Sequence, residues 1–100
     1  MSEIETARAP AGWVIGVMVQ TPGEPMQRCY YAVGQPDRSR AEWTAVDCAV
    51  SAGEVATSPV SGAEPVEALK ALTRPRMAML GLAHGEVREL GWRYPRRWLA

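Results

Sequence analysis

The chain alternates short apolar runs with turn-forming segments, and the period of each run predicts a strand or a helix. In the stretch GWVIGVMVQ, residues 12–20, every odd position from Trp13 to Val19 is apolar. Val14 and Met18 make the other face apolar as well. A strand that is apolar on both faces belongs in the interior of a sheet, so we expect this stretch to be a central strand.

A second strand is predicted immediately after the first. The segment TPGEP, residues 21–25, contains two prolines and a glycine, which are typical of a turn. MQRCYYAVG, residues 26–34, then places Cys29, Tyr31 and Val33 on one face. The two stretches together predict a β-hairpin.

The next segment changes to the period of a helix. In SRAEWTAVDCAVSAG, residues 39–53, Trp43, Val46 and Val50 recur at helical spacing, with Ala49 alongside. We expect these four residues to form the face that packs against the core.

Signals for helix ends support this prediction and that of a second helix. Ser39 and Glu42 have the spacing of a capping box, and Gly53 is placed to stop the first helix in a left-handed conformation. Ser61 and Glu64 repeat the capping-box spacing further along the chain.

Two further elements are predicted between residues 54 and 72. EVATSPV, residues 54–60, is a short third strand, and Pro59 confines it to an edge or a strand end because proline cannot donate to a ladder. Val66, Leu69 and Leu72 then mark one face of the second helix.

The last third of the chain predicts a short helix and a fourth strand. Thr73 and Pro75 are suited to begin a new helical turn, and MAMLGL, residues 77–82, forms a short helix that closes at Gly81. HGEVREL, residues 84–90, is a fourth strand.

This order of elements, β-β-α-β-α-β, predicts the α+β class. We expect a small, mostly antiparallel four-stranded sheet with two to three helices packed on one face. Residues 1–11 lack sustained periodicity and are predicted to be a disordered, flexible N-terminal arm. Residues 12–100 are expected to form a single α+β domain.

Composition places the chain among folded globular domains and gives it no net charge that would favour nucleic-acid partners. Hydrophobic residues make up 47% of the 100 residues and charged residues 22%, which is far from the signature of disorder. Eleven basic side chains balance eleven acidic ones, whereas a dedicated nucleic-acid binder is usually basic overall. Fifteen alanines, and ten arginines against one lysine, are typical of a GC-rich bacterial genome.

Targeting and redox signals favour a cytoplasmic protein. The run WVIGVMV is too short to span a bilayer, and Glu3 and Glu5 precede it where a signal peptide would carry a cationic leader. We therefore expect no transmembrane segment. Cys29 and Cys48 stand nineteen positions apart without a CxxC motif, which favours reduced thiols over a disulfide framework.

Candidate catalytic chemistry is sparse. Structural zinc needs four Cys or His ligands, but this chain offers Cys29, Cys48 and His84, so no metal site is predicted. His84 is the only imidazole base, and we interpret it as a loop histidine because no nucleophile motif accompanies it. The cysteines are interpreted as core residues. No phosphate-binding loop is present, so we expect no cofactor and assign no catalytic residue. A non-enzymatic protein is therefore favoured over an enzyme that would use His84.

The last ten residues, GWRYPRRWLA, contain the strongest candidate for a binding site. Three arginines could neutralise phosphates while aromatic side chains stack on unpaired bases, or the indoles could lie at a lipid interface. The interpretation that we favour is structural, with the final tryptophan folded back over the sheet. The candidate binding residues are Arg93, Tyr94, Arg96, Arg97 and Trp98.

Three function hypotheses follow, and no motif points to a particular family. The first is a non-enzymatic module that acts through protein contacts, either with itself as a homodimer or with another protein. The alternative is single-stranded nucleic-acid binding through the basic aromatic C-terminal segment. The third is an enzyme or ligand-binding domain with its pocket between the sheet and the helices, which only His84 and scattered carboxylates support. The sequence identifies no small-molecule ligand.

Overall fold

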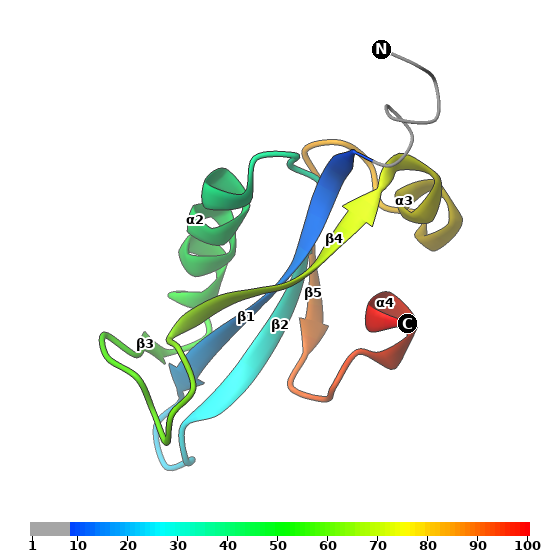
Figure 1. Ribbon diagram of the computed structural model, residues 1–100. Coiled ribbons are helices and arrows are strands. Elements are labelled where there is room, and N and C mark those ends of the chain that lie inside the picture. The colour runs from blue at the N-terminus through cyan, green and yellow to red at the C-terminus, as the bar shows by residue number, and fades with distance from the viewer. Residues whose placement is uncertain (1–8) are drawn as a thin grey trace.

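A central antiparallel sheet separates the helices in the computed structural model of the chain, which describes residues 9–100 (Figure 1). The elements, in chain order, are β1 (Pro10–Gln20), β2 (Gln27–Val33), α2 (Arg38–Ala49), β3 (Glu54–Val55), β4 (Val66–Thr73), α3 (Arg74–Leu80), β5 (Val87–Gly91) and α4 (Arg96–Leu99). The α+β class that the sequence predicts is confirmed. The predicted first and second strands correspond to β1 and β2, and the predicted strand at residues 84–90 corresponds to β5.

Strand β1 is the centre of the sheet, as its two apolar faces predict. It pairs with β2 along one edge, and with β4 and the two-residue β3 along the other. Strand β5 extends the sheet by pairing with β2. Every pairing is antiparallel. The described sheet has five strands, one more than predicted, because a segment expected to be helical pairs with β1.

That segment, residues 66–73, is strand β4, so the predicted second helix is wrong. A register shift opposite Val14 and Ile15 leaves Leu69 as a β-bulge between Lys70 and Ala68. The extra residue interrupts the two-residue alternation of the strand. It places Leu69 and Leu72, which are three residues apart, on the same side of the sheet, and this spacing is also that of a helix face. Pairing with the free edge of β1 overrides the helix propensity of this segment.

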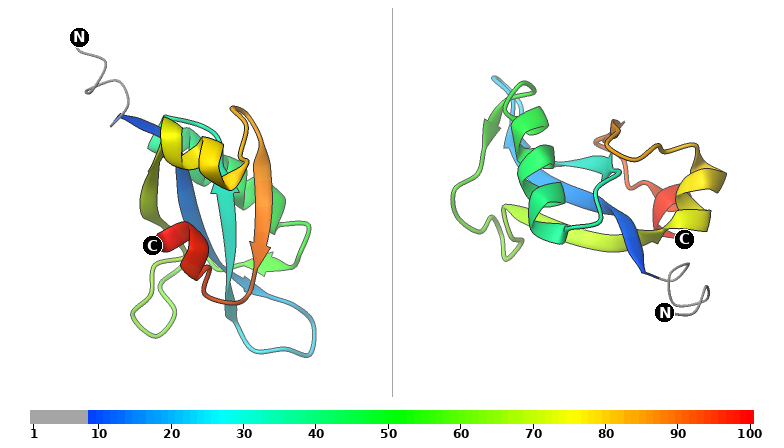
Figure 2. Two further views of the ribbon diagram at one scale, coloured as in Figure 1. Left: turned by 90° about the vertical axis from the view of Figure 1, so that its right-hand side faces the viewer. Right: turned by 90° about the horizontal axis from the view of Figure 1, so that it is seen from above.

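The helices cover both faces of the sheet, whereas the sequence predicted one face (Figure 2). On one face, α2 packs on a cluster that includes Ile15 and Tyr31. On the other face, α3 and α4 pack on a cluster that includes Val14 and Ala32. Successive residues of a strand point to opposite faces, so β1 and β2 supply buried side chains to both clusters.

The ends of α3 are the predicted ones, and those of α2 are not. Thr73 Oγ1 accepts a hydrogen bond from the backbone N–H of Arg76, and Gly81 closes α3 with φ 74°. Helix α2 is capped by Asp37, whose side chain accepts from the N–H of Arg40, so the predicted capping box at residues 39 and 42 is wrong. Asp37, which immediately precedes the first helical residue, provides the oxygen that caps the helix.

The predicted helix stop at Gly53 is also wrong, because α2 ends at Ala49 with Val50 as its C-cap in a right-handed conformation. Gly53 is needed for another reason. A Cβ at this position would lie 2.5 Å from the backbone oxygen of Gln20, so only glycine allows the chain to pass the end of β1.

The start of the chain follows the prediction only in part. Residues 1–8 of the predicted arm lie outside the described residues. Pro10 and Ala11 belong to β1, where Pro10 pairs with Thr73, so the strand begins two residues before the predicted boundary.

Candidate functional site

Helix α2 turns its smallest residues toward the sheet. Its buried residues are Ala41, Ala45 and Ala49, which share one helical face. Trp43 and Val50 point away from the sheet and are 71% and 60% exposed. Of the four residues predicted to form the core face of this helix, only Ala49 is buried, so the predicted face is wrong. Methyl side chains let the helix backbone approach the sheet closely, whereas an indole at the contact would hold it away.

An apolar groove lies beside the exposed side of α2. Its walls come from α2, from β3 with the residues that follow it, and from the start of β4. The groove has a volume of about 560 Å³, which is within the range of ligand-binding pockets. We refer to it as the Trp43 groove, and it is lined by Glu42, Trp43, Val46, Val55, Ala56, Thr57 and Val66.

The segment that forms this groove is acidic. Residues 41–69 contain five carboxylates and no lysine or arginine. Glu42 forms an ion pair with Arg38 at 2.9 Å, and Glu67 forms one with Arg28 at 3.1 Å. The other three carboxylates make no ion pair with any residue that the structure describes: Asp47, Glu54 and Glu64.

At the C-terminal end, the predicted site residues are divided between the core and solvent. Trp98 is only 8% exposed and belongs to the core cluster beneath α3. The guanidinium carbon of Arg88 lies 5.7 Å from the centre of a Trp98 ring, which is the distance of a cation–π contact. Arg76 Nη2 donates to the backbone oxygen of Arg97 at 2.6 Å. Helix α4 is thus docked on the sheet, and its indole is covered.

The other four predicted site residues are exposed. Tyr94 is 63% exposed, and its ring meets that of Tyr30 edge to face, with centroids 6.1 Å apart and an interplanar angle of 85°. Arg93, Arg96 and Arg97 are exposed, and their guanidinium groups form no ion pair among residues 9–100. The structure therefore brings basic and aromatic side chains together on this surface, without Trp98.

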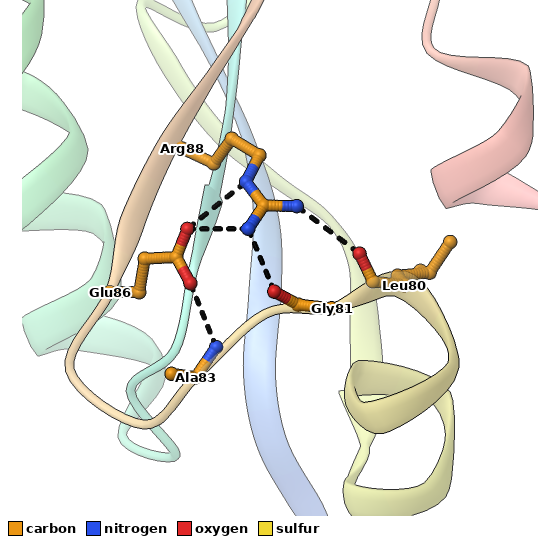
Figure 3. A network of polar contacts seen from close by, with 5 residues as sticks. All are labelled: Leu80, Gly81, Ala83, Glu86 and Arg88. Atoms are coloured by element: carbon orange, nitrogen blue, oxygen red, sulfur yellow. Dashed lines mark hydrogen bonds and ion pairs between the residues drawn. The ribbon is translucent and has the colours of Figure 1, made fainter.

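Arg88 holds the loop between α3 and β5 in place (Figure 3). Its guanidinium donates to the backbone oxygens of Leu80 and Gly81 at the end of α3, at 3.1 and 2.7 Å. Nε and Nη2 also donate to Glu86 Oε2 at 3.0 and 2.6 Å. Glu86 Oε1 accepts from the N–H of Ala83 at 2.9 Å. This backbone hydrogen bond and the Arg88 guanidinium lower the pKa of the Glu86 carboxyl.

His84 lies exposed in the same loop, as expected for a loop histidine. It lines a second hollow, of about 460 Å³, together with Arg74, Met77 and Leu82 among others. Within residues 9–100, no three His, Cys, Asp or Glu side chains come together as a metal ion requires.

The cysteines are both free thiols. Cys29 is fully buried, as expected for a core residue, and its Sγ donates to Tyr31 Oη at 3.4 Å. Burial raises the pKa of the Cys29 thiol and also that of Tyr31. Cys48 is half-buried on α2, and burial together with the nearby carboxylate of Asp47 raises its pKa. A raised pKa keeps both thiols protonated near neutral pH, where the thiol is a poor nucleophile.

The sequence assigned Trp43, Val46 and Val50 to the core and so did not identify the Trp43 groove. A signal for it is nevertheless present. Alanine recurs at positions 41, 45 and 49, which is a second helical stripe made of the residue with the highest helix propensity and the smallest side chain after glycine.

No helix among the described residues is long and apolar enough to cross a bilayer. No protein-family model, curated protein or solved structure matches this chain. Its geometry and chemistry are therefore the basis on which a function is proposed.

Proposed function

We propose that this chain is a non-enzymatic protein-interaction module that binds its partner in the Trp43 groove. The observation that carries the proposal is the exposure of Trp43, at 71%, beside an apolar groove that is already formed. An exposed tryptophan next to a concave apolar surface has the composition and shape of an interface hot spot.

The packing of α2 explains how such a surface arises without loss of the fold. Ala41, Ala45 and Ala49 fasten the helix to the sheet, so the larger side chains on its other face are free for contacts. Val46, Val55 and Val66 supply aliphatic walls from three different elements. Burying this area would be favourable for a partner with an apolar anchor, at about 25 cal/mol per Å² of apolar surface.

The charge of the segment indicates the chemistry of the partner. The only charged side chains in residues 41–69 are five carboxylates, and three of these form no ion pair within the described chain. A docking segment should therefore join an aromatic or aliphatic anchor to arginine or lysine, because complementary charge favours encounter and correct orientation.

Selection of random peptides on the immobilised protein tests this proposal. Peptides of about 12 residues that bind should be enriched in an apolar anchor flanked by Arg or Lys, and Trp43→Ser should weaken their binding about thirtyfold. Met79→Ser is the matched control, since Met79 is 62% exposed on the far side of the sheet. Failure to enrich any peptide, or equal loss in both variants, would overturn the proposal.

Single-stranded nucleic-acid binding at the C-terminal end is a second candidate. It is favoured by the guanidinium groups of Arg93, Arg96 and Arg97, which have no ion pair in the described part of the chain. The burial of Trp98 leaves Tyr94 and Trp92 as the aromatic side chains for stacking. This candidate predicts that an oligo-dT of about 15 nucleotides quenches the tryptophan fluorescence of the protein. It also predicts that the affinity for the oligonucleotide falls steeply as the salt concentration rises. An unchanged spectrum at low salt would exclude it.

A further inference from the structure

We infer that the occupant of the Trp43 groove is the loop between β5 and α4 of a second copy of this chain. The inference rests on the proposed function, since it assigns a partner to the same groove. We refer to residues 92–96, which are this loop and the first residue of α4, as the presented loop. In it, Trp92 and Tyr94 are 38% and 63% exposed, and Arg93 and Arg96 are exposed beside them.

The presented loop is held at both ends. Before it, β5 is paired with β2 from Val33 to Tyr30. After it, α4 is anchored by Trp98 beneath Arg88. A loop fixed in this way loses little conformational entropy when it binds, which favours affinity.

The two surfaces are complementary in chemistry. The presented loop joins aromatic anchors to guanidinium groups, and the Trp43 groove joins aliphatic walls and an indole to an acidic segment. Residues 70–100 contain seven Lys or Arg against two Asp or Glu, whereas residues 41–69 contain five carboxylates and no cation. An arginine placed over Trp43 would add a cation–π contact to the charge attraction.

The fold prevents the two surfaces from meeting within one molecule. Helix α2, which carries Trp43, and helix α4, which follows the presented loop, lie on opposite sides of the sheet (Figure 2). The contact must therefore form between copies, head to tail, so that each copy uses one groove and one loop. Such a heterologous contact closes into a ring of copies or, where the rotation between copies does not close, extends into an open chain with a free groove at one end and a free loop at the other.

Mixing two defective variants tests the head-to-tail arrangement. Trp43→Asp removes the indole from the groove, and the double variant Tyr94→Ser, Arg96→Glu removes an aromatic ring and a guanidinium group from the loop. All three side chains are exposed, and Tyr94→Ser also removes the edge-to-face contact with Tyr30. Far-ultraviolet circular dichroism verifies that each variant is folded. We expect the wild type to increase in mass between about 10 μM and about 1 mM protein in analytical ultracentrifugation.

Each variant alone should remain a monomer over this range. An equimolar mixture should form a dimer and no larger species, because only one intact groove and one intact loop remain to be joined. Met79→Ser, the control, should associate like the wild type. Raising NaCl from about 50 to about 500 mM should weaken wild-type association at least tenfold, since the charged groups are exposed to solvent.

Three outcomes would overturn the inference. The first is a wild type that stays monomeric throughout, and the second is a mixture that stays monomeric while the wild type associates, which indicates a symmetric contact. The third is self-association of either variant alone as strong as that of the wild type, which would place the contact elsewhere. In each case, enriched peptides that depend on Trp43 would still support the proposed function with a different partner, so the failure of one proposal is distinguishable from the failure of the other.

Discussion

Arg88 connects three parts of the molecule through one guanidinium group. A guanidinium group has only donors, and those of Arg88 bind the end of α3 and Glu86. Its Cζ also lies 5.7 Å from the centre of a Trp98 ring. A positive charge at the C-terminal end of a helix also interacts favourably with the helix dipole. Arg88 therefore stabilises both the position of α4 and the loop between α3 and β5.

Replacing Arg88 with Met should destabilise the protein, although methionine retains an aliphatic stem. We expect a loss of about 1–2 kcal/mol in the free energy of unfolding, because charge-assisted hydrogen bonds are lost at a partly exposed site. Urea unfolding measures this change. Arg93→Met is the matched control and should change stability by less than about 0.5 kcal/mol, since the Arg93 guanidinium forms no ion pair within the described chain. Equal effects would show that the network contributes nothing.

Glu86 should make stability depend on pH in the acidic range. The pKa of its carboxyl is lowered in the folded protein by the Ala83 N–H and by Arg88. The ionised carboxylate therefore contributes fully to folding stability above the ordinary pKa of 4.5. This contribution is lost as pH falls through the lower pKa of the folded protein. Glu86→Gln should be less stable than the wild type near pH 7, and the difference should decrease below about pH 4.5. A difference between the two proteins that stays constant as pH falls would contradict this account.

At the scale of elements, the sequence predicts strands better than it predicts which helix face is buried. Strand β1 was predicted because it is apolar on both faces and has no helical period. The buried face of α2 was not predicted, because the sequence contains two helical stripes. One consists of Trp43, Val46 and Val50, and the other contains Ala41 and Ala45. The choice between two stripes depends on how much space the sheet leaves, which is a tertiary property.

The face on which a bulge residue lies is equally difficult to predict. Leu69 in β4 and Leu90 in β5 each stand at a register shift, and each packs against the cluster beneath α3 and α4. Val87, three residues before Leu90, packs on the opposite face. A bulge can be recognised only with the partner strand in place, so the sequence pattern alone gave β4 a helical period.

The two stripes of α2 predict opposite responses to substitution. Ala45→Leu should cost about 1–3 kcal/mol of unfolding free energy, because it places extra methylenes between the helix and the sheet. Trp43→Ala should change stability by less than about 0.5 kcal/mol, since its side chain is 71% exposed. Thermal or urea unfolding of both variants measures this. A larger loss in Trp43→Ala than in Ala45→Leu would contradict the packing described above.

At the scale of the whole molecule, one sheet supports two cores. The cluster under α2 and the cluster under α3 and α4 share β1 and β2, which contribute alternate residues to each. Neither core can lose its strands while the other is intact. We therefore expect the two sides to unfold in a single transition.

Trp98→Ala tests this coupling. Removing a buried tryptophan should cost about 3–5 kcal/mol, although the side chain lies on the face opposite α2. Circular dichroism and tryptophan fluorescence should give the same urea midpoint in the wild type and the same lower midpoint in the variant. A fluorescence transition that precedes the loss of circular dichroism would show that the α4 side unfolds independently.

The central position of β1 has a consequence for how the chain reaches its fold. Its second edge is completed by β4, whose residues follow about fifty to sixty positions later in the chain, with Val17 paired to Val66 and Pro10 to Thr73. At the usual rate of chain elongation on the ribosome, β4 is synthesised about 3 to 10 seconds after β1. During that time, a strand that is apolar on both faces has an unpaired edge, to which a strand of another nascent chain can pair. The yield of folded protein should therefore depend on synthesis rate and on chaperone supply during this interval.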